Sequence, residues 1–155
     1  MHILFLQVGG TIDKDYPQRE MDHGYEFKIG EAAFLSIISR ANFAYSWSAR
    51  SVMRKDSLDM TDHDRSSLRV HVARAGEEHI IITHGTDTID KTAATLSDIR
   101  GKTIVLTGAR HPEKFKDSDA DFNLGMAVGA VQCLSNGVYV ALNGAVLPWN
   151  EFRVL

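Results

Sequence analysis

Short apolar runs, most of them ended by glycine or a polar turn residue, divide this chain into predicted strands. We predict strands at residues 3–8, 44–53, 79–83, 103–107 and 137–142. The run at 44–53 partly alternates between apolar and polar positions, whereas the other four are almost continuously apolar or β-branched. Continuous apolar strands are typical of a sheet that is buried on both faces.

Helical spacing of apolar residues fills the segments between these strands. Residues 31–41 carry Phe34, Ile37, Ile38 and Ala41 on one face. Thr61 followed by Asp64 resembles a capping box and predicts that a helix starts there. Further helices are predicted at about 87–97 and at 122–134, and the last of these is apolar enough that we expect Cys133 in the core.

Strands and helices that alternate along a chain predict an α/β fold. We expect an open, doubly wound, flavodoxin-like fold, with a mostly parallel sheet of about five strands and helices on both faces. A length of 155 residues fits one domain that covers residues 1–155.

Composition and charge exclude several classes of function. Twenty acidic residues oppose 17 basic ones, and no basic stripe is present, so we predict no nucleic-acid partner. No apolar run approaches the roughly 20 residues that span a bilayer, so no membrane contact is expected. The first run has no basic flank and no cleavage site, so it fits a strand better than a leader peptide. Cys133 is the single cysteine, which favours a reducing, cytoplasmic location.

Polar and small residues follow the predicted strands, where doubly wound sheets bind their ligands. The first, third and fourth strands are followed by Gly9-Gly10-Thr11, His84-Gly85-Thr86-Asp87 and Gly108-Ala109, and the second by Asp56-Ser57. Glycines let a ligand approach the main chain closely. A threonine hydroxyl attacks a carbonyl only with help from a base or a cation, so Thr11 and Thr86 with Asp87 beside them are candidate catalytic groups.

Simpler interpretations exist for each of these motifs. Gly-Gly-Thr after a strand is often only a turn, and Thr and Asp are common helix caps. The occurrence of both motifs at successive strand ends favours function. Seven histidines form no His-x-x-x-His pair with a nearby glutamate, and no phosphate-binding glycine motif is present, so we predict neither a metal nor a cofactor.

The order of these motifs resembles that of the bacterial-type L-asparaginases. Val8-Gly9-Gly10-Thr11-Ile12 and Thr83-His84-Gly85-Thr86-Asp87-Thr88 are similar to the two signatures of that family, Thr-Gly-Gly-Thr-Ile and His-Gly-Thr-Asp-Thr. Ser57-Leu58-Asp59-Met60, the stretch 105–112 and Phe122-Asn123-Leu124 are also similar to family motifs. Usual members are about twice as long, so the chain resembles a short, single-domain branch.

The resemblance implies a role for each matching residue in the hydrolysis of L-asparagine, or of a similar small amide, to L-aspartate and ammonia. Thr11 would form the acyl-enzyme, and Thr86 would activate water or share the nucleophilic work together with a lysine. Ser57 would hold the substrate's α-carboxylate and Asp87 its α-amino group. Other positions expected in the substrate pocket are Gly10, Asp56, Leu58, Gly85 and Ala109.

Tyr16 and Tyr25 both match the tyrosine that would assist Thr11. They lie in or just after the loop at residues 13–24, which we expect to act as a lid. Leu58 stands where long members have a glutamine. The family's lysine, about eleven residues past Asn143, falls on Val154. Because valine carries no charge, two functions stay open: an amidohydrolase, and an impaired homologue that binds a small amino acid without turnover.

The family resemblance also implies assembly. We expect a homodimer or a higher homo-oligomer, because long members assemble through symmetric contacts. The apolar residues Trp149, Phe152, Val154 and Leu155 follow the last predicted strand. They would either pack against the edge of the sheet or contribute to a subunit interface.

Overall fold

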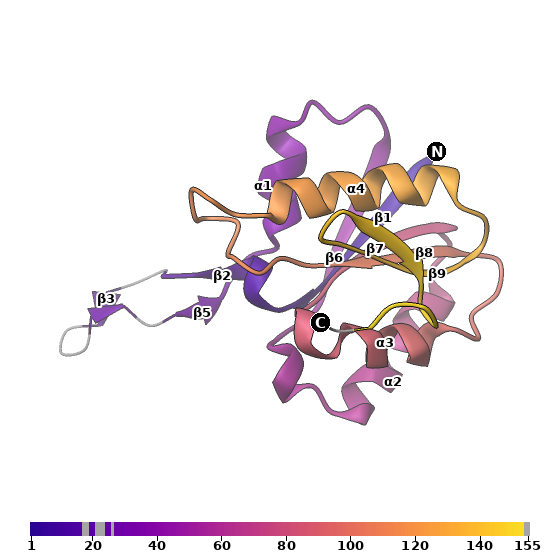
Figure 1. Ribbon diagram of the computed structural model, residues 1–155, viewed down its shortest axis with the longest axis horizontal. Helices are drawn as coiled ribbons and strands as arrows, with labels where there is room; N and C mark the ends of the chain where they lie inside the picture. The colour runs from indigo at the N-terminus through magenta and orange to yellow at the C-terminus, as the bar shows by residue number, and fades with distance from the viewer. Residues whose placement is uncertain (17–18, 21–23, 26, 154–155) are drawn as a thin grey trace.

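The structure, a computed structural model, describes residues 1–16, 19–20, 24–25 and 27–153, with only the main chain described at 19–20 and 24–25. Its centre is a six-stranded sheet (Figure 1). The strands are β1 (His2–Gly9), β6 (Ser46–Lys55), β7 (His79–Thr83), β8 (Thr103–Thr107), β9 (Gly137–Leu142) and β10 (Ala145–Pro148). All neighbouring pairs are parallel except β9 and β10, so the prediction of a mostly parallel sheet is confirmed.

The strand order places a topological switch point beside β1. The order is β10-β9-β8-β7-β1-β6, so the chain leaves β1 for β6 on one side and then returns to β7 on the other. This is the flavodoxin-like order that we expected, extended by one antiparallel edge strand. The carboxyl ends of β1 and β7 are therefore neighbours, and each is followed by one of the two threonine motifs.

Helices cover both faces of the sheet. On one face α1 (Ala33–Arg40) and α4 (Ala120–Cys133) pack against Phe5, Ile81 and Val105. On the other, α2 (Asp62–Arg74) and α3 (Ile89–Leu96) pack against alternate residues of the same strands, as Figure 1 shows. The residues of β1, β7, β8 and β9 are mostly buried, which accounts for their almost continuously apolar sequence.

One of two predictions about the helices is confirmed and the other is wrong. The capping box before α2 is confirmed, because the Thr61 side chain accepts from the Asp64 main chain while the Asp64 side chain accepts from the Thr61 main chain. The expectation of a buried Cys133 is wrong, since this cysteine is exposed. α4 buries Leu124, Ala127 and Val131, and a residue two positions after Val131 lies on the opposite side of the helix.

A narrow β arm follows β1 and extends from the body of the molecule (Figure 1). Its base pairs β2 (Lys14–Asp15) with β5 (Lys28–Ile29), and further out β3 (Arg19–Glu20) pairs with β4 (Gly24–Tyr25). We expected a loop over residues 13–24, and the structure instead has the short strands β2 and β3 and the start of β4 within this range, while the role of a lid stays a prediction. Antiparallel pairing satisfies main-chain groups that an isolated loop would leave to water.

Candidate active site

Gly10 brings the end of β1 into main-chain contact with the turn after β7, and Gly9 brings it into main-chain contact with Lys55 of β6. Gly9 and Gly10 have φ angles of 121° and 90°, which only glycine adopts readily. A Cβ on Gly10 would lie 2.3 Å from the Gly85 nitrogen, so no side chain fits between the two turns. Thr11 comes next, half-buried, as the first residue of a 3₁₀ turn (Thr11–Asp13).

Buried Asp13 fixes the far end of this turn. Its carboxylate accepts from the Ala33 main-chain N–H at 2.7 Å and from the Gln7 side-chain amide at 3.0 Å. Burial raises the pKa of Asp13 to about 6, although these two hydrogen bonds and the charge of Arg54 act in the opposite direction. Asp13 therefore joins the Thr11 turn to the start of α1. From the sequence, we expected this residue in the loop at 13–24.

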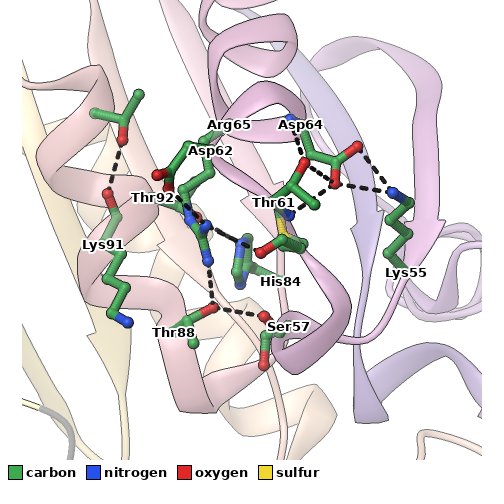
Figure 2. Close-up of polar contacts among 12 residues, drawn as sticks. Lys55, Ser57, Thr61, Asp62, Asp64, Arg65, His84, Thr88, Lys91 and Thr92 are labelled. Atoms are coloured by element: carbon green, nitrogen blue, oxygen red, sulfur yellow. Dashed lines mark hydrogen bonds and ion pairs between the residues drawn. The ribbon is translucent and has the colours of Figure 1, made fainter.

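The turn after β7 is built around a neutral histidine. His84 is fully buried, and its Nδ1 lies 2.7 Å from the Gly85 carbonyl oxygen. Because that oxygen can only accept, Nδ1 carries the proton and Nε2 accepts from the Thr92 hydroxyl at 2.8 Å (Figure 2). Burial lowers the pKa of His84 to about 4. The half-buried Thr86 then begins a second 3₁₀ turn (Thr86–Thr88), which continues into α3.

A third 3₁₀ turn (Ser57–Asp59), after β6, packs directly on this one. A Cβ on Gly85 would lie 2.6 Å from the Ser57 side chain, so Gly85 leaves the room that Ser57 occupies. Ser57 is 1% exposed, and its hydroxyl lies 3.5 Å from an Asp87 carboxylate oxygen. The Thr88 hydroxyl donates to the Ser57 carbonyl at 2.8 Å. The structure thus brings the Ser57 and Thr86 turns together as one packed unit.

Asp56 and Leu58 lie at the border of this unit. The Asp56 carboxylate accepts from the Leu58 main-chain N–H at 3.3 Å and forms a 2.6 Å ion pair with Lys14 of the arm. The Leu58 side chain is 73% exposed and leaves the unit for solvent. Of the sequence-predicted pocket residues, Asp56 therefore already has a cationic partner, and Leu58 contributes only main chain to the packed turns.

Both candidate tyrosines belong to the arm, since Tyr16 directly follows β2 and Tyr25 is the last residue of β4. The Tyr16 ring is 45% exposed and stacks on Phe27 of the arm at a centroid distance of 4.8 Å. The side chain of Tyr25, like the whole of Val154, lies outside the described residues. Arg153, one position before Val154, is exposed and donates to the carbonyls of Asn150 and Phe152.

Asn123 has a supporting role that the sequence did not reveal. Its side-chain amide is fully buried and donates to the Gly108 carbonyl at 3.0 Å, while its carbonyl accepts from the Asn143 main-chain N–H at 3.1 Å. It therefore joins the end of β8, next to the buried Ala109, to the end of β9. The only available signal was the Phe-Asn-Leu motif, which suggests no role by itself.

The chemistry of this arrangement is that of hydroxyls and carboxylates. Thr11, Ser57, Thr86 and Asp87 follow three adjacent strands, and Gly10 and Gly85 keep their turns in contact. Within the described residues, no group of three or more metal-binding side chains gathers. Among the same residues, no helix is long and apolar enough to cross a membrane.

Comparison with known proteins identifies the family of this chain. The family described as "Asparaginase, N-terminal" matches residues 2–153. This chain belongs to the asparaginase family. The L-asparaginase of Thermococcus kodakarensis is 32% identical over 152 residues, which cover 95% of this chain and 45% of that protein. L-asparaginase 2 of Escherichia coli is 29% identical over 97% of this chain and 45% of its own length.

Other similarities extend the family assignment. The solved structure of the thermostable L-asparaginase from Thermococcus kodakarensis superimposes with a TM-score of 0.82 at 28% identity, covering 96% of this chain and 46% of that one. A glutamyl-tRNA(Gln) amidotransferase component from Methanococcus vannielii is 42% identical over 73 residues, 46% of this chain and 17% of that protein. This asparaginase-family chain spans about half the length of the curated asparaginases that it matches.

Proposed function

We propose that this chain is an amidohydrolase that converts L-asparagine, or a similar small amide, to L-aspartate and ammonia through an acyl-enzyme on Thr11. The observation that carries the proposal is the contact of the Thr11 and Thr86 turns at the switch point, with Ser57 packed against Gly85. Ligands of doubly wound sheets bind at this point. The names of the matching relatives, among them two L-asparaginases, support the same reaction.

In the proposed reaction, Thr11 Oγ1 attacks the carbonyl carbon of the side-chain amide. The hydroxyl proton goes to the departing nitrogen, ammonia leaves, and an aspartyl ester remains on Thr11. Thr86 assists the water that hydrolyses this ester, which releases L-aspartate and restores the Thr11 hydroxyl. A prearranged site favours such steps because its polar groups need no reorganisation.

Recognition of the amino-acid end is assigned to Ser57 and Asp87. The Ser57 hydroxyl donates to the α-carboxylate, and the Asp87 carboxylate accepts from the α-ammonium group. Asp87 is exposed and, within the described part of the chain, forms no ion pair, so its charge is available to a ligand. Gly10, Gly85 and Ala109 form walls where the ligand meets main chain. Tyr16 and Tyr25 both remain candidates for the tyrosine that assists Thr11.

A second candidate function is binding of a small amino acid without turnover. It is favoured by valine at position 154, where the family's lysine is expected. Within the described part of the chain, no lysine or arginine forms an ion pair with Asp87 and could take the place of that lysine. A nucleophilic threonine without a nearby cation or base stays protonated and reacts slowly. This candidate keeps the roles of Ser57 and Asp87 and removes those of Thr11 and Thr86.

Ammonia release from L-asparagine separates the two functions. The first function predicts release by the wild type and a loss of at least about 10³-fold in Thr11→Ala. Thr95→Ala is the matched control, because the Thr95 hydroxyl donates to the Lys91 carbonyl of its own helix. Equal release by wild type and Thr11→Ala would refute the acyl-enzyme. A thermal shift with L-aspartate but no release by either protein would support the second function.

Location and assembly are also proposals. We propose a cytoplasmic location on the basis of the single cysteine. The matching proteins carry both kinds of description, since one solved relative is a probable cytoplasmic L-asparaginase from Campylobacter jejuni and one curated relative is a probable periplasmic one. We further propose a homodimer or higher homo-oligomer, which gel filtration with light scattering tests directly.

A further inference from the structure

A buried arginine lies behind the Ser57 turn, outside the motifs that identify the family. Arg65 is in the first turns of α2 and is only 5% exposed. Its guanidinium donates to the Met60 carbonyl at 3.1 Å and to the Thr88 hydroxyl at 3.0 Å (Figure 2). Burial of a charged group is costly unless its hydrogen bonds and its charge are compensated.

Thr88 connects this arginine to the proposed substrate site. Its hydroxyl accepts from Arg65 and donates to the Ser57 carbonyl at 2.8 Å, so the order of donors runs from the arginine through the threonine to the serine. All three groups are buried. The relay joins α2 to the Thr86–Thr88 turn and to the Ser57 turn, and it holds the serine main chain in one place.

The positive charge of Arg65 is only weakly neutralised by the protein. Its one carboxylate within ion-pair distance in the described part of the chain is Asp62, at 3.3 Å, whose own side chain is completely exposed. An exposed carboxylate is well screened by water. The guanidinium Nε has no hydrogen-bond partner among the described residues.

The field of Arg65 also reaches the end of β7. Burial is the main reason that the pKa of His84 is low, and the charge of Arg65 lowers it further, while the charges of Asp56 and Asp90 act in the opposite direction. A buried cation behind a cleft that is only partly neutralised favours an anion in that cleft. The Ser57 hydroxyl, which lies 3.5 Å from an Asp87 carboxylate oxygen, is where the proposed function puts the substrate's α-carboxylate.

We propose that Arg65 is a positioning residue that, through Thr88, fixes Ser57 and provides the positive field for the α-carboxylate of the substrate. This inference rests on the proposed function of Ser57. Arg65 itself touches no substrate atom. It acts on affinity for the carboxylate, and so on KM and product binding, and leaves kcat nearly unchanged.

The test compares two ligands that differ at the α-carboxylate alone. L-Isoasparagine carries a neutral amide in place of the α-carboxylate of L-aspartate. By isothermal titration, Arg65→Met should weaken L-aspartate binding about tenfold and change L-isoasparagine binding less than about twofold. The matched control is Arg69→Met, one turn further along α2, because Arg69 pairs with Asp98 at the surface and should leave both affinities unchanged.

A second pair of variants keeps the arginine and removes only the relay. Thr88→Val should weaken L-aspartate binding about threefold, and Thr88→Ser, which restores the hydroxyl, should bind within about twofold of the wild type. If Arg65→Met does not fold, the two Thr88 variants still test whether the relay to Ser57 affects L-aspartate binding. A purely structural arginine would weaken both ligands equally, and unchanged aspartate affinity in Arg65→Met and Thr88→Val would also overturn the inference.

Failure of the proposed function gives a different result. A wild type that neither binds L-aspartate nor releases ammonia from L-asparagine overturns the proposed function and this inference together. A wild type that binds L-aspartate, with variants that do not discriminate between the two ligands, overturns the inference alone.

Discussion

The turns after β1 and β7 are similar in sequence, yet different interactions stabilise them. Each consists of glycine, threonine and an aspartate close by, and each begins a 3₁₀ turn. The β1 turn depends on two glycines with positive φ and on a buried carboxylate. The β7 turn has ordinary φ angles and depends on a neutral histidine and a threonine relay. Similar motifs therefore need not tolerate the same changes.

Their anchors also respond to pH in opposite directions. The pKa of Asp13 is raised in the folded state, so its contribution to stability is complete below pH 3.8 and is lost as pH rises through about 6. The pKa of His84 is lowered, so its contribution is complete above pH 6.5 and is lost as pH falls through about 4. The β1 turn is thus favoured by acid and the β7 turn by neutral pH.

The largest expected effect is the loss of stability on substitution of the two contacting glycines, Gly10 and Gly85. Gly10→Ala should cost on the order of 4 kcal/mol of unfolding free energy, because it adds left-handed backbone strain to a clash with main chain. Gly85 has a φ of −70°, which alanine also adopts, and an added Cβ would meet the Ser57 side chain. We therefore expect Gly85→Ala to lower the unfolding free energy by about 2 kcal/mol. Urea denaturation of both variants measures the difference.

Gly129→Ala is the control for this pair. Gly129 lies on the exposed side of α4 with nothing within 4 Å of an added Cβ, so alanine should stabilise the protein by about 0.5–1 kcal/mol. Equal losses in Gly10→Ala and Gly85→Ala would show that the β1 turn has no special need for glycine.

A smaller effect should appear in the pH dependence of the β1 turn. Between about pH 4 and pH 7, the wild type should lose about 2.4 kcal/mol of stability relative to Asp13→Asn, because only the wild type must ionise a buried carboxyl. Both proteins contain His84, so its contribution cancels in the difference. Urea midpoints across this range test the idea, and parallel curves for the two proteins would argue against a raised pKa.

The sequence predicted the strands best where apolar runs meet small residues. The predicted ranges 79–83, 103–107 and 137–142 are those of β7, β8 and β9. The edge strand β6 was displaced by two residues, because its mostly exposed residues give little pattern. The strand β10 was missed although Asn143-Gly144, both with positive φ, is a strong hairpin signal.

The sequence predicted which residues follow the strand ends and form the candidate site. It did not predict the buried residues that hold those turns in place. Thr11, Ser57 and Thr86 each follow a strand, so the topology rule alone brings them near one another. Arg65 and Asn123 are on helices and support turns distant in sequence, through contacts that no local pattern encodes. The same holds for Asp13, whose raised pKa depends on burial beneath α1.

The central claim is that the β1 and β7 turns form one catalytic site, and a double-mutant cycle on ammonia release from L-asparagine tests it most directly. Groups that act as a unit are strongly non-additive, so the account predicts that the double variant Thr11→Ala/Thr86→Ala is no slower than the worse single variant. If the two single losses instead multiply in the double variant, Thr11 and Thr86 act independently and the claim is wrong.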